Sequence, residues 1–417
     1  MDSDNWYKVD NVAKVFLATH TERDTRSLRV SCTLKEKIDA ASLEEALIKT
    51  IKSRPFLQVR IRRGFFWHYL EPTDELPLVS EENERPCPVL YGKNSKRVLH
   101  YSVTYYHNRI NFEVFHALSD GTGALEFLNL LVCNYLKIKH PDELRKVDLG
   151  NDGSRADIEE DSFARFYGKK GKSAPPSKKA YHIRGRMLPY DQLQFIEVTM
   201  KAKDVIARAK EMEVSVSSLI GADLMIAIYK DMPAIKRKLP ITISVPVNLR
   251  NYYPSETSRN FFNSIYISHE FSGGETLETL AREFDQKMKN SLNPDNIRQN
   301  MDHFQRMERM FFVRMIPLAL KQPVVKYVSK LEARKVSAVV SNLGIMRIPE
   351  PMQKYVEKYT AFCSHNELFM TICSYGEDMT FGITSGYRNT GVLKTFIRDF
   401  SKNGIAVTVN ATEVVRS

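Results

Sequence analysis

The sequence predicts an α+β protein built from two halves that each mix strands with helices. Strand-like and helix-like segments occur in similar proportion before residue 150 and after residue 186. They do not follow the regular β-α alternation of a parallel, doubly wound sheet. The segment between them holds an acidic patch, a basic stretch and the helix-breaking pair Pro175 and Pro176. We therefore expect an N-terminal half at 1–150, a crossover linker at 151–185 and a C-terminal half at 186–417.

The first half opens with apolar, β-branched segments that predict strands at 12–19 and 28–34. A helix should follow, beginning with a capping box formed by Ser42 and Glu45 and ending at Pro55. Apolar residues from 125 to 135 then recur at helical spacing. Further strands are expected at 57–61, 98–106 and 110–116, the last two joined as a hairpin.

The second half shows the same mixture of patterns. Strands are expected at 194–200, 241–247, 261–269, 337–342, 361–364, 368–374 and 379–385. Helices are expected at 203–212 and 215–231, over most of 275–328, and at 392–403.

The composition restricts the class of protein and its partners. The chain has 417 residues and a net charge of +11, which favours anionic partners, although no nucleic-acid motif is present. Its five cysteines form no C-x-x-C pair, so zinc and redox motifs are not expected. The acidic start does not resemble a secretory signal, and no window has the ~18 uncharged apolar residues of a membrane span. We expect a cytoplasmic monomer with no metal.

Residues 115–124 carry the strongest indication of chemistry. His116 ends an apolar strand, Asp120 follows four residues later, and Gly121 and Gly123 open a helix. A histidine in such a turn is well suited to proton transfer near neutral pH. A structural histidine followed by an Asp-Gly turn and helix cap has the same spacing. The spacing alone leaves both interpretations open.

His116-Ala-Leu-Ser-Asp120-Gly121 resembles the His-x-x-x-Asp-Gly motif of the CoA-dependent acyltransferase superfamily. That group includes chloramphenicol acetyltransferase, the condensation domains of peptide synthetases, wax ester synthases and alcohol acetyltransferases. Further segments are similar in family order, at 38–57, at 246–250 with 260–264, and at 341–344. Within this group, we expect a protein that resembles the alcohol acetyltransferases. Phe115 stands where many members carry a second histidine, and the Asp-Phe-Gly-Trp-Gly motif of plant members is absent.

The resemblance implies two chloramphenicol-acetyltransferase-like halves, with mixed sheets, flanking helices and the active site between the halves. His116 would act as general base for an alcohol or amine acceptor. The co-substrate would be an acyl-CoA, with acetyl-CoA expected, and no cofactor would stay bound. Asp120 would pair with Arg250 to support the site together with Gly121. Ser341 and Asn342 are candidates for stabilising the oxyanion.

Alternatives remain at several of these positions. Arg250 also fits a solvated loop charge, and Ser341 and Asn342 also fit an ordinary turn after a buried strand. His20, His68 and His100 lack metal-ligand spacing and are expected to be packing or surface residues. The protein could also be a condensation-like enzyme that takes its acyl group from a carrier protein, or a catalytically silent relative that binds a ligand or partner.

Overall fold

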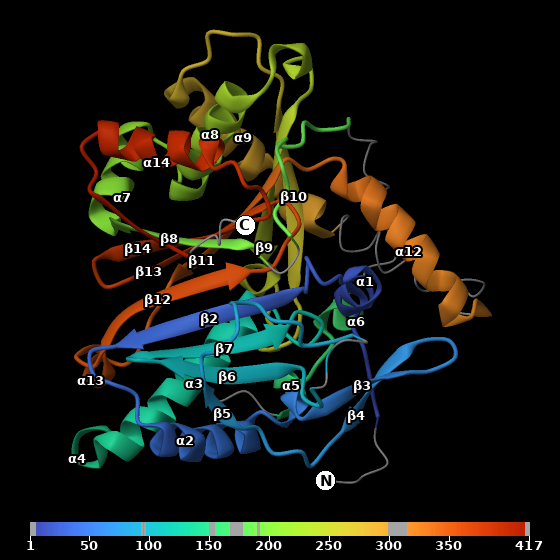
Figure 1. Cartoon of the computed structure of the whole chain (residues 1–417), viewed down its shortest axis with the longest axis vertical. Helices are drawn as coiled ribbons and strands as arrows, with labels where there is room; N and C mark the ends of the chain where they lie inside the picture. Colours follow the sequence, from blue (N-terminus) through green and yellow to red (C-terminus); the bar gives the residue numbers. More distant parts are fainter. Residues whose placement is uncertain are drawn as a thin grey trace.

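The computed structural model describes residues 6–92, 95, 97–149, 155–166, 178–189, 192–298 and 315–412. Its described strands form sheets of five, seven and three strands with helices packed against them, which confirms the predicted α+β class. Figure 1 shows the two larger sheets one above the other. Helices α2 and α3 lie below the lower sheet, and α7, α8, α9 and α14 lie above the upper one.

The five-stranded sheet has the order β12-β2-β7-β6-β5. Its strands are β2 (Ser27–Leu34), β5 (Val79–Glu81), β6 (Tyr101–Tyr106), β7 (Arg109–Phe115) and β12 (Val356–Cys363). β6 and β7 form the predicted hairpin, and β2 pairs antiparallel with both β7 and β12. Every residue of β2 is buried, so neither face of this strand is open to solvent.

Helices α2 (Ala40–Ser53) and α3 (Gly121–Lys139) cover this sheet, and the 3₁₀ helix η1 (Pro55–Leu57) follows α2. The predicted capping box at Ser42 is wrong. The N-cap of α2 is Asp39, whose Oδ1 accepts a hydrogen bond from the Ser42 backbone N–H at 2.9 Å. Aspartate is a good N-cap because its carboxylate satisfies amides of the first turn.

Residues 11–19 form helix α1 (Asn11–Thr19), so the strand predicted there is wrong. Asp10 caps this helix, and its Oδ1 accepts a hydrogen bond from the Ala13 N–H at 2.7 Å. Ala13 and Leu17 lie four residues apart on one buried face. The cap and the burial of that face outweigh the modest helix propensity of the β-branched residues. The three-stranded sheet next to this segment consists of β1 (Tyr7–Lys8), β4 (His68–Pro72) and β3 (Val59–Arg63), in that order.

The seven-stranded sheet has the order β10-β9-β11-β13-β14-β8-β15. Its strands are β8 (Gln194–Lys201), β9 (Ile241–Asn248), β10 (Phe262–His269), β11 (Ala338–Ile345), β13 (Leu368–Tyr375), β14 (Asp378–Ser385) and β15 (Val407–Ala411). β11 is parallel to β9 and β13, while the other pairs are antiparallel, so the sheet is mixed as predicted.

The helices on the outer face of this sheet are α7 (Ala202–Glu211), α8 (Val216–Asp231), α9 (Leu277–Ser291) and α14 (Gly391–Lys402). The remaining helices are α4 (Pro141–Leu144), α5 (Arg155–Ile158), α6 (Ser162–Arg165), α12 (Leu318–Ala333), α13 (Glu350–Gln353), η2 (Ala234–Lys236) and η3 (Leu249–Asn251). Within the described ranges, no single helix is long and apolar enough to cross a membrane, and one bent pair, α7 with α8, passes that test only in combination.

Each large sheet has its own hydrophobic core. A segment near the C-terminus of the chain returns to the first of these cores. The first core contains residues of the N-terminal 150 together with Met346, Ile348, Met352 and Val356. The second core is built from residues after 180. The boundaries at 150 and 186 stay a prediction, to which the structure adds that a C-terminal segment completes the first core. Of the expected linker, most of the basic run lies outside the described residues.

Candidate active site

His116 follows the last residue of β7 and lies between elements of both halves. Its backbone N–H donates a hydrogen bond to the Arg26 carbonyl at 2.8 Å. The centre of its ring is 4.5 Å from that of Phe16 on α1 and 5.7 Å from that of Phe262 on β10. The residue is half-buried. The ring is therefore held by packing on two sides and keeps some access to solvent.

The amide of Asn260 determines which ring nitrogen of His116 carries the proton. Asn260 Nδ2 donates hydrogen bonds to the His116 carbonyl at 2.9 Å and to Asp10 Oδ2 at 3.3 Å. Because both of these partners are acceptors, Oδ1 is the atom that faces His116 Nδ1, at 3.1 Å. Nδ1 must then carry the proton and donate it to Asn260. The lone pair on Nε2 is left free to accept a proton.

Burial also keeps this imidazole neutral. It lowers the pKa of His116 below the usual value of 6.5, while the negative charge of Asp120 and the hydrogen bond to Asn260 oppose part of that change. A neutral ring with a free Nε2 is the form that a general base requires.

Asp10 is the third member of this chain of hydrogen bonds. Its carboxylate is buried, caps α1 and accepts the hydrogen bond from Asn260. Arg259 Nη2 lies 3.7 Å from its Oδ2. Burial raises the pKa of Asp10 to about 6, and Arg259 lowers it in part. The hydrogen bonds therefore connect the cap of α1, through Asn260, to the ring of His116.

Asp120 and Arg250 form an ion pair across the two halves. Arg250 Nη1 lies 2.9 Å from Asp120 Oδ2, and Nη2 lies 3.3 Å from Oδ1. The side chains are only 5% and 9% exposed. Arg250 also donates to the carbonyls of Thr257 and Arg259. The guanidinium therefore ties the turn after His116 to the segment that carries Asn260.

The Asp120 carboxylate also accepts hydrogen bonds from backbone N–H groups of both halves. Asp120 Oδ1 accepts from the Gly123 N–H at 3.0 Å as the N-cap of α3, and Oδ2 accepts from the Phe261 N–H at 2.9 Å. Asp120 makes no hydrogen bond to the His116 ring. Its geometry is that of a support for the loop, and it does not form a proton relay with His116.

The two glycines of the motif allow the start of α3 to approach the second half closely. A Cβ on Gly123 would lie 2.1 Å from the Ser258 carbonyl oxygen, which is backbone that cannot move aside. A Cβ on Gly121 would lie 2.7 Å from the end of the Leu343 side chain. The absence of side chains at these positions lets the start of α3 pack against the second half.

Ser341 and Asn342 lie on β11, close to the residue that contacts Gly121. The Asn342 amide is already engaged, since Nδ2 donates to Ser217 Oγ at 3.0 Å and Oδ1 accepts from the Gly344 N–H. Within the described part of the chain, the Ser341 hydroxyl has no hydrogen-bond partner, and the residue is half-buried. Of the two oxyanion candidates, Ser341 is thus the one with a donor available.

Sequence analysis did not assign a role to Asn260 or Asp10. Asn260 was noted only as the start of a family-like segment, and Asp10 lies in a stretch expected to precede a strand. Their roles depend on contacts 144 and 250 residues away in the chain. A local signal existed for Asp10 alone, because aspartate before a segment with apolar residues four apart is a common helix cap.

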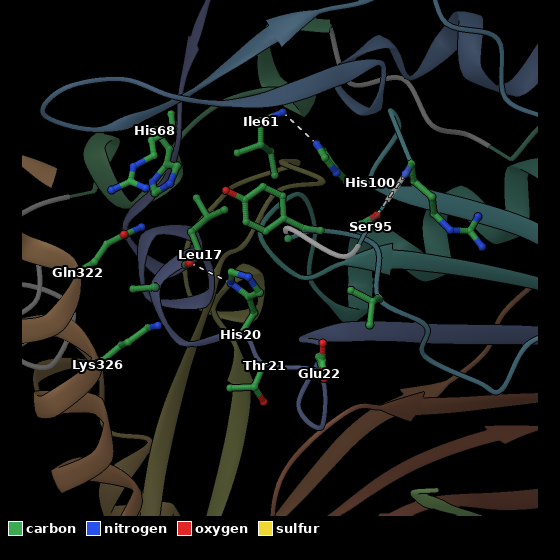
Figure 2. Close-up of a pocket in the computed structure, with 16 residues that line it drawn as sticks. Leu17, His20, Thr21, Glu22, Ile61, His68, Ser95, His100, Gln322 and Lys326 are labelled. Atoms are coloured by element: carbon green, nitrogen blue, oxygen red, sulfur yellow. Dashed lines mark hydrogen bonds between the residues drawn. The ribbon is translucent and has the colours of Figure 1, made fainter. Parts of the chain in front are cut away.

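A cavity of about 630 Å³ lies beside α1 (Figure 2). Leu17 of α1 and His20, the C-cap of that helix, line it together with His68, His100 and Lys326. His100 is bonded on both nitrogens, to the Leu90 carbonyl and the Ile61 N–H, so it is a packing residue as predicted. His116 and Asn260 do not line this cavity. It adjoins the site through α1, whose Phe16 contacts His116.

No protein-family model and no curated protein matches the chain in sequence. Solved structures match it over nearly its full length. Polyketide synthase associated protein 5 from Mycobacterium tuberculosis is 13% identical, with a TM-score of 0.64 over 94% of this chain and 96% of that one. The chain has the fold of the CoA-dependent acyltransferases and condensation domains.

Two further structures match the chain at a similar level. F. sporotrichioides TRI101, solved with coenzyme A and T-2, is 12% identical, with a TM-score of 0.60 over 96% of this chain and 99% of that one. The first condensation domain of the CDA synthetase is 14% identical, with a TM-score of 0.59 over 96% and 95%. The resemblance inferred from the motifs is confirmed at the level of the fold.

Proposed function

We propose that this protein is an acyltransferase that moves an acyl group from an acyl-CoA thioester to an alcohol or amine, with His116 as general base. The observation that carries the proposal is the state of the His116 ring. Burial lowers its pKa and so favours the neutral form, the bond to Asn260 Oδ1 selects the tautomer with the proton on Nδ1, and Nε2 is left to accept a proton. The fold, and the coenzyme A in the TRI101 structure, support the choice of donor.

The proposed reaction needs no nucleophile from the protein. His116 Nε2 removes the proton from the acceptor O–H or N–H as that atom bonds to the thioester carbonyl carbon. The tetrahedral oxyanion then collapses, the C–S bond breaks, and the thiolate takes the proton from the imidazolium. Asn260 Oδ1 accepts the Nδ1–H in both charge states. It stabilises the imidazolium because the hydrogen bond to the charged ring is the stronger one. Base catalysis of this kind contributes about 10²–10⁴-fold.

The supporting residues act on position and charge. The Asp120–Arg250 pair fixes the turn that carries His116, and we assign Ser341 as the donor to the oxyanion. The net charge of +11 favours the phosphates of a CoA donor. Acetyl-CoA is the donor we expect.

A carrier-protein thioester is the second candidate donor, because condensation domains share the fold at the same level of similarity. Both donors present the same thioester carbon to the same base. They differ in the surface that must recognise the carrier, so only an assay with both donors separates them.

The direct test measures thiol release from a panel of acyl-CoAs with and without alcohols and amines. All five cysteines are buried, so a thiol reagent will report mainly released CoA. We expect acceptor-dependent release together with an acylated product. Turnover with a carrier-bound acyl group alone would favour the condensation-like alternative. Failure of both donors across the panel would favour a catalytically silent relative.

A further inference from the structure

Helix α12 presents its apolar side chains to solvent. Only Leu318 of its 16 residues is buried. The outer face carries five apolar residues that are between 36% and 65% exposed, namely Leu320, Val324, Tyr327, Val328 and Leu331. They recur three and four residues apart and so form one stripe along the helix. A surface helix ordinarily turns such a stripe toward the core.

The turn between β3 and β4 extends this apolar face. Phe65 and Trp67 in that turn are 72% and 46% exposed. The Leu318 N–H donates to the Phe65 carbonyl at 2.8 Å, and Lys321 Nζ donates to the Phe66 carbonyl at 3.1 Å. Figure 1 shows the turn and α12 together at one edge of the molecule. We name Phe65, Trp67 and the five residues of the stripe the α12 surface.

Positive charge borders the α12 surface. Residues 318–335 contain one acidic residue, Glu332, which pairs with Lys335 at 2.7 Å. They contain five basic residues, namely Lys321, Lys326, Lys330, Arg334 and Lys335. At 100° per residue, Lys330 and Arg334 lie along one side of the stripe, whereas Lys326 faces the cavity beside α1. Basic residues beside an exposed apolar stripe, with Trp, Tyr and Phe among the exposed residues, are typical of helices that lie in a membrane interface.

We propose that the α12 surface binds an anionic lipid membrane, with α12 lying in the plane of the interface and spanning nothing. Phe65, Trp67 and the stripe enter the boundary of the acyl chains, and Lys330 and Arg334 contact the phosphates of the headgroups. A second copy of the chain is a poorer occupant, because a twofold contact over this stripe places the basic residues of both copies together. The proposal does not rest on the proposed acyl transfer.

The test uses the full chain with vesicles of phosphatidylcholine containing about one third phosphatidylglycerol, and with phosphatidylcholine alone. The only two tryptophans are Trp67 and Trp6, which packs against Tyr69 of β4, so intrinsic fluorescence reports on this region. We expect the protein to sediment with the anionic vesicles, and its emission to shift to shorter wavelength. Both effects should weaken on neutral vesicles and as the salt concentration rises.

Matched variants assign the binding to the α12 surface. Leu320→Ser with Tyr327→Ser should reduce the vesicle-bound fraction about tenfold or more, because both side chains are exposed and carry the apolar contact. Lys330→Gln with Arg334→Gln should weaken binding and reduce its dependence on salt. The control is Leu76→Ser with Leu78→Ser, two residues that are 65% and 73% exposed outside the α12 surface, and it should bind as the wild type does.

Three results would overturn the proposal. The first is a wild-type protein that does not sediment with anionic vesicles. The second is unchanged binding by the Leu320→Ser/Tyr327→Ser variant, with its urea unfolding curve matching that of the wild type. The third is a wild-type dimer that the same variant converts to monomer while neither protein binds vesicles, which would identify the stripe as a contact between copies.

Discussion

Asp120 and Arg250 are 130 residues apart in the chain and form a buried, two-point ion pair that joins the halves next to His116. The carboxylate also caps α3 and accepts from the Phe261 N–H, so this one group holds the His116 turn, a helix and the segment of Asn260 in register. Such a pair sets geometry more than it adds net stability, because desolvation offsets much of its attraction.

Breaking this pair from one side should be strongly destabilising. Asp120→Asn keeps the capacity to cap α3, and Arg250→Ala removes the cation. Each should lower the free energy of unfolding by ~3–5 kcal/mol and reduce activity, because a buried charge loses its partner. The double variant should be no worse than the worse single variant, since the interaction is shared.

Urea unfolding and turnover measure both effects. The control is Arg62→Ala, which breaks an exposed pair with Glu71 and should change stability by only ~0–1 kcal/mol. Simple addition of the two single effects would contradict the shared interaction.

His116→Ala should reduce kcat by about 10²–10⁴-fold with little change in the unfolding curve, because the half-buried ring contributes a base and few tertiary bonds. The control is His140→Ala, since His140 pairs with Glu36 away from the site and should be dispensable for turnover. Turnover that is unchanged with a good substrate would remove His116 from the proposed mechanism.

Two substitutions of Asn260, to Ala and to Asp, should move the pH profile in opposite directions. Its bond to Nδ1 stabilises the protonated ring, so Asn260→Ala should lower the pKa of His116 further and move the acid limb of kcat/KM to lower pH. kcat should also fall, because the orientation of the ring is lost. Asn260→Asp adds a negative charge and should move that limb to higher pH.

The pH–rate profiles of these variants can be compared with Asn263→Ala, three residues further along. If the role of Asn260 were merely structural, all of these variants would have a lower kcat and the acid limb of kcat/KM would not move. The same protonation state can be read without activity, from the nitrogen chemical shifts of the His116 ring. A ring protonated on Nε2 in the wild type would contradict the role of Asn260 even if the enzyme turns over.

Much of this site could be predicted from sequence because its signals are local. His116 stands where an apolar strand ends, and Asp120 stands where a helix begins, which are patterns of neighbouring residues. The family-like order of motifs supplied Arg250 as the partner of Asp120. Asn260 and Asp10 could not be assigned roles, because these arise from tertiary hydrogen bonds between segments about 150 and 250 residues apart.

The fold shows the same division between local and tertiary information. The hairpin of β6 and β7 is indicated by its local turn at His107 and Asn108, and helix α8 by a long apolar run that follows the N-cap Ser215. Residues 12–19 are mostly apolar, with three β-branched residues, and look like a strand, but the cap at Asp10 and a face buried against the protein make them a helix. The pairing of β12 with β2 depends on strand register between Thr360 and Ser31, and no local pattern encodes it.

Asp10 should give the protein a distinctive dependence of stability on pH. Burial raises its pKa to about 6 in the folded protein, from an ordinary 3.8, with Arg259 opposing the shift and Asp161 adding to it. A raised carboxyl pKa means that the folded state binds the proton more tightly than the unfolded state. The stability from this group is therefore present at low pH and lost as the pH rises through 6.

Asp10→Asn mimics the protonated form and can still cap α1. Its stability relative to the wild type should rise by about 2–3 kcal/mol between about pH 4 and pH 8, measured by urea unfolding. The control is Asp39→Asn at the exposed cap of α2, where hydrogen bonds from Ser42 lower the pKa of the carboxyl below 3.8. The contribution of that group is lost only at lower pH, so the stability of Asp39→Asn relative to the wild type should change little over this range. A constant difference for Asp10→Asn across this range would show that the carboxyl is ionised throughout.

The final prediction separates the two oxyanion candidates. The Ser341 hydroxyl has no partner within the described part of the chain, whereas Asn342 already donates to Ser217 and accepts from Gly344. A donor that is free before the reaction can bond to the oxyanion without breaking an existing bond, so preorganisation favours Ser341. Ser341→Ala should therefore lower kcat by about 10²-fold with KM nearly unchanged, because the bond forms in the transition state. Asn342→Ala should affect stability more than kcat, since it removes two hydrogen bonds at the register shift within β11. Ser341→Thr keeps a hydroxyl and should restore part of the rate. If Asn342→Ala loses kcat while Ser341→Ala does not, the assignment of the donor is reversed.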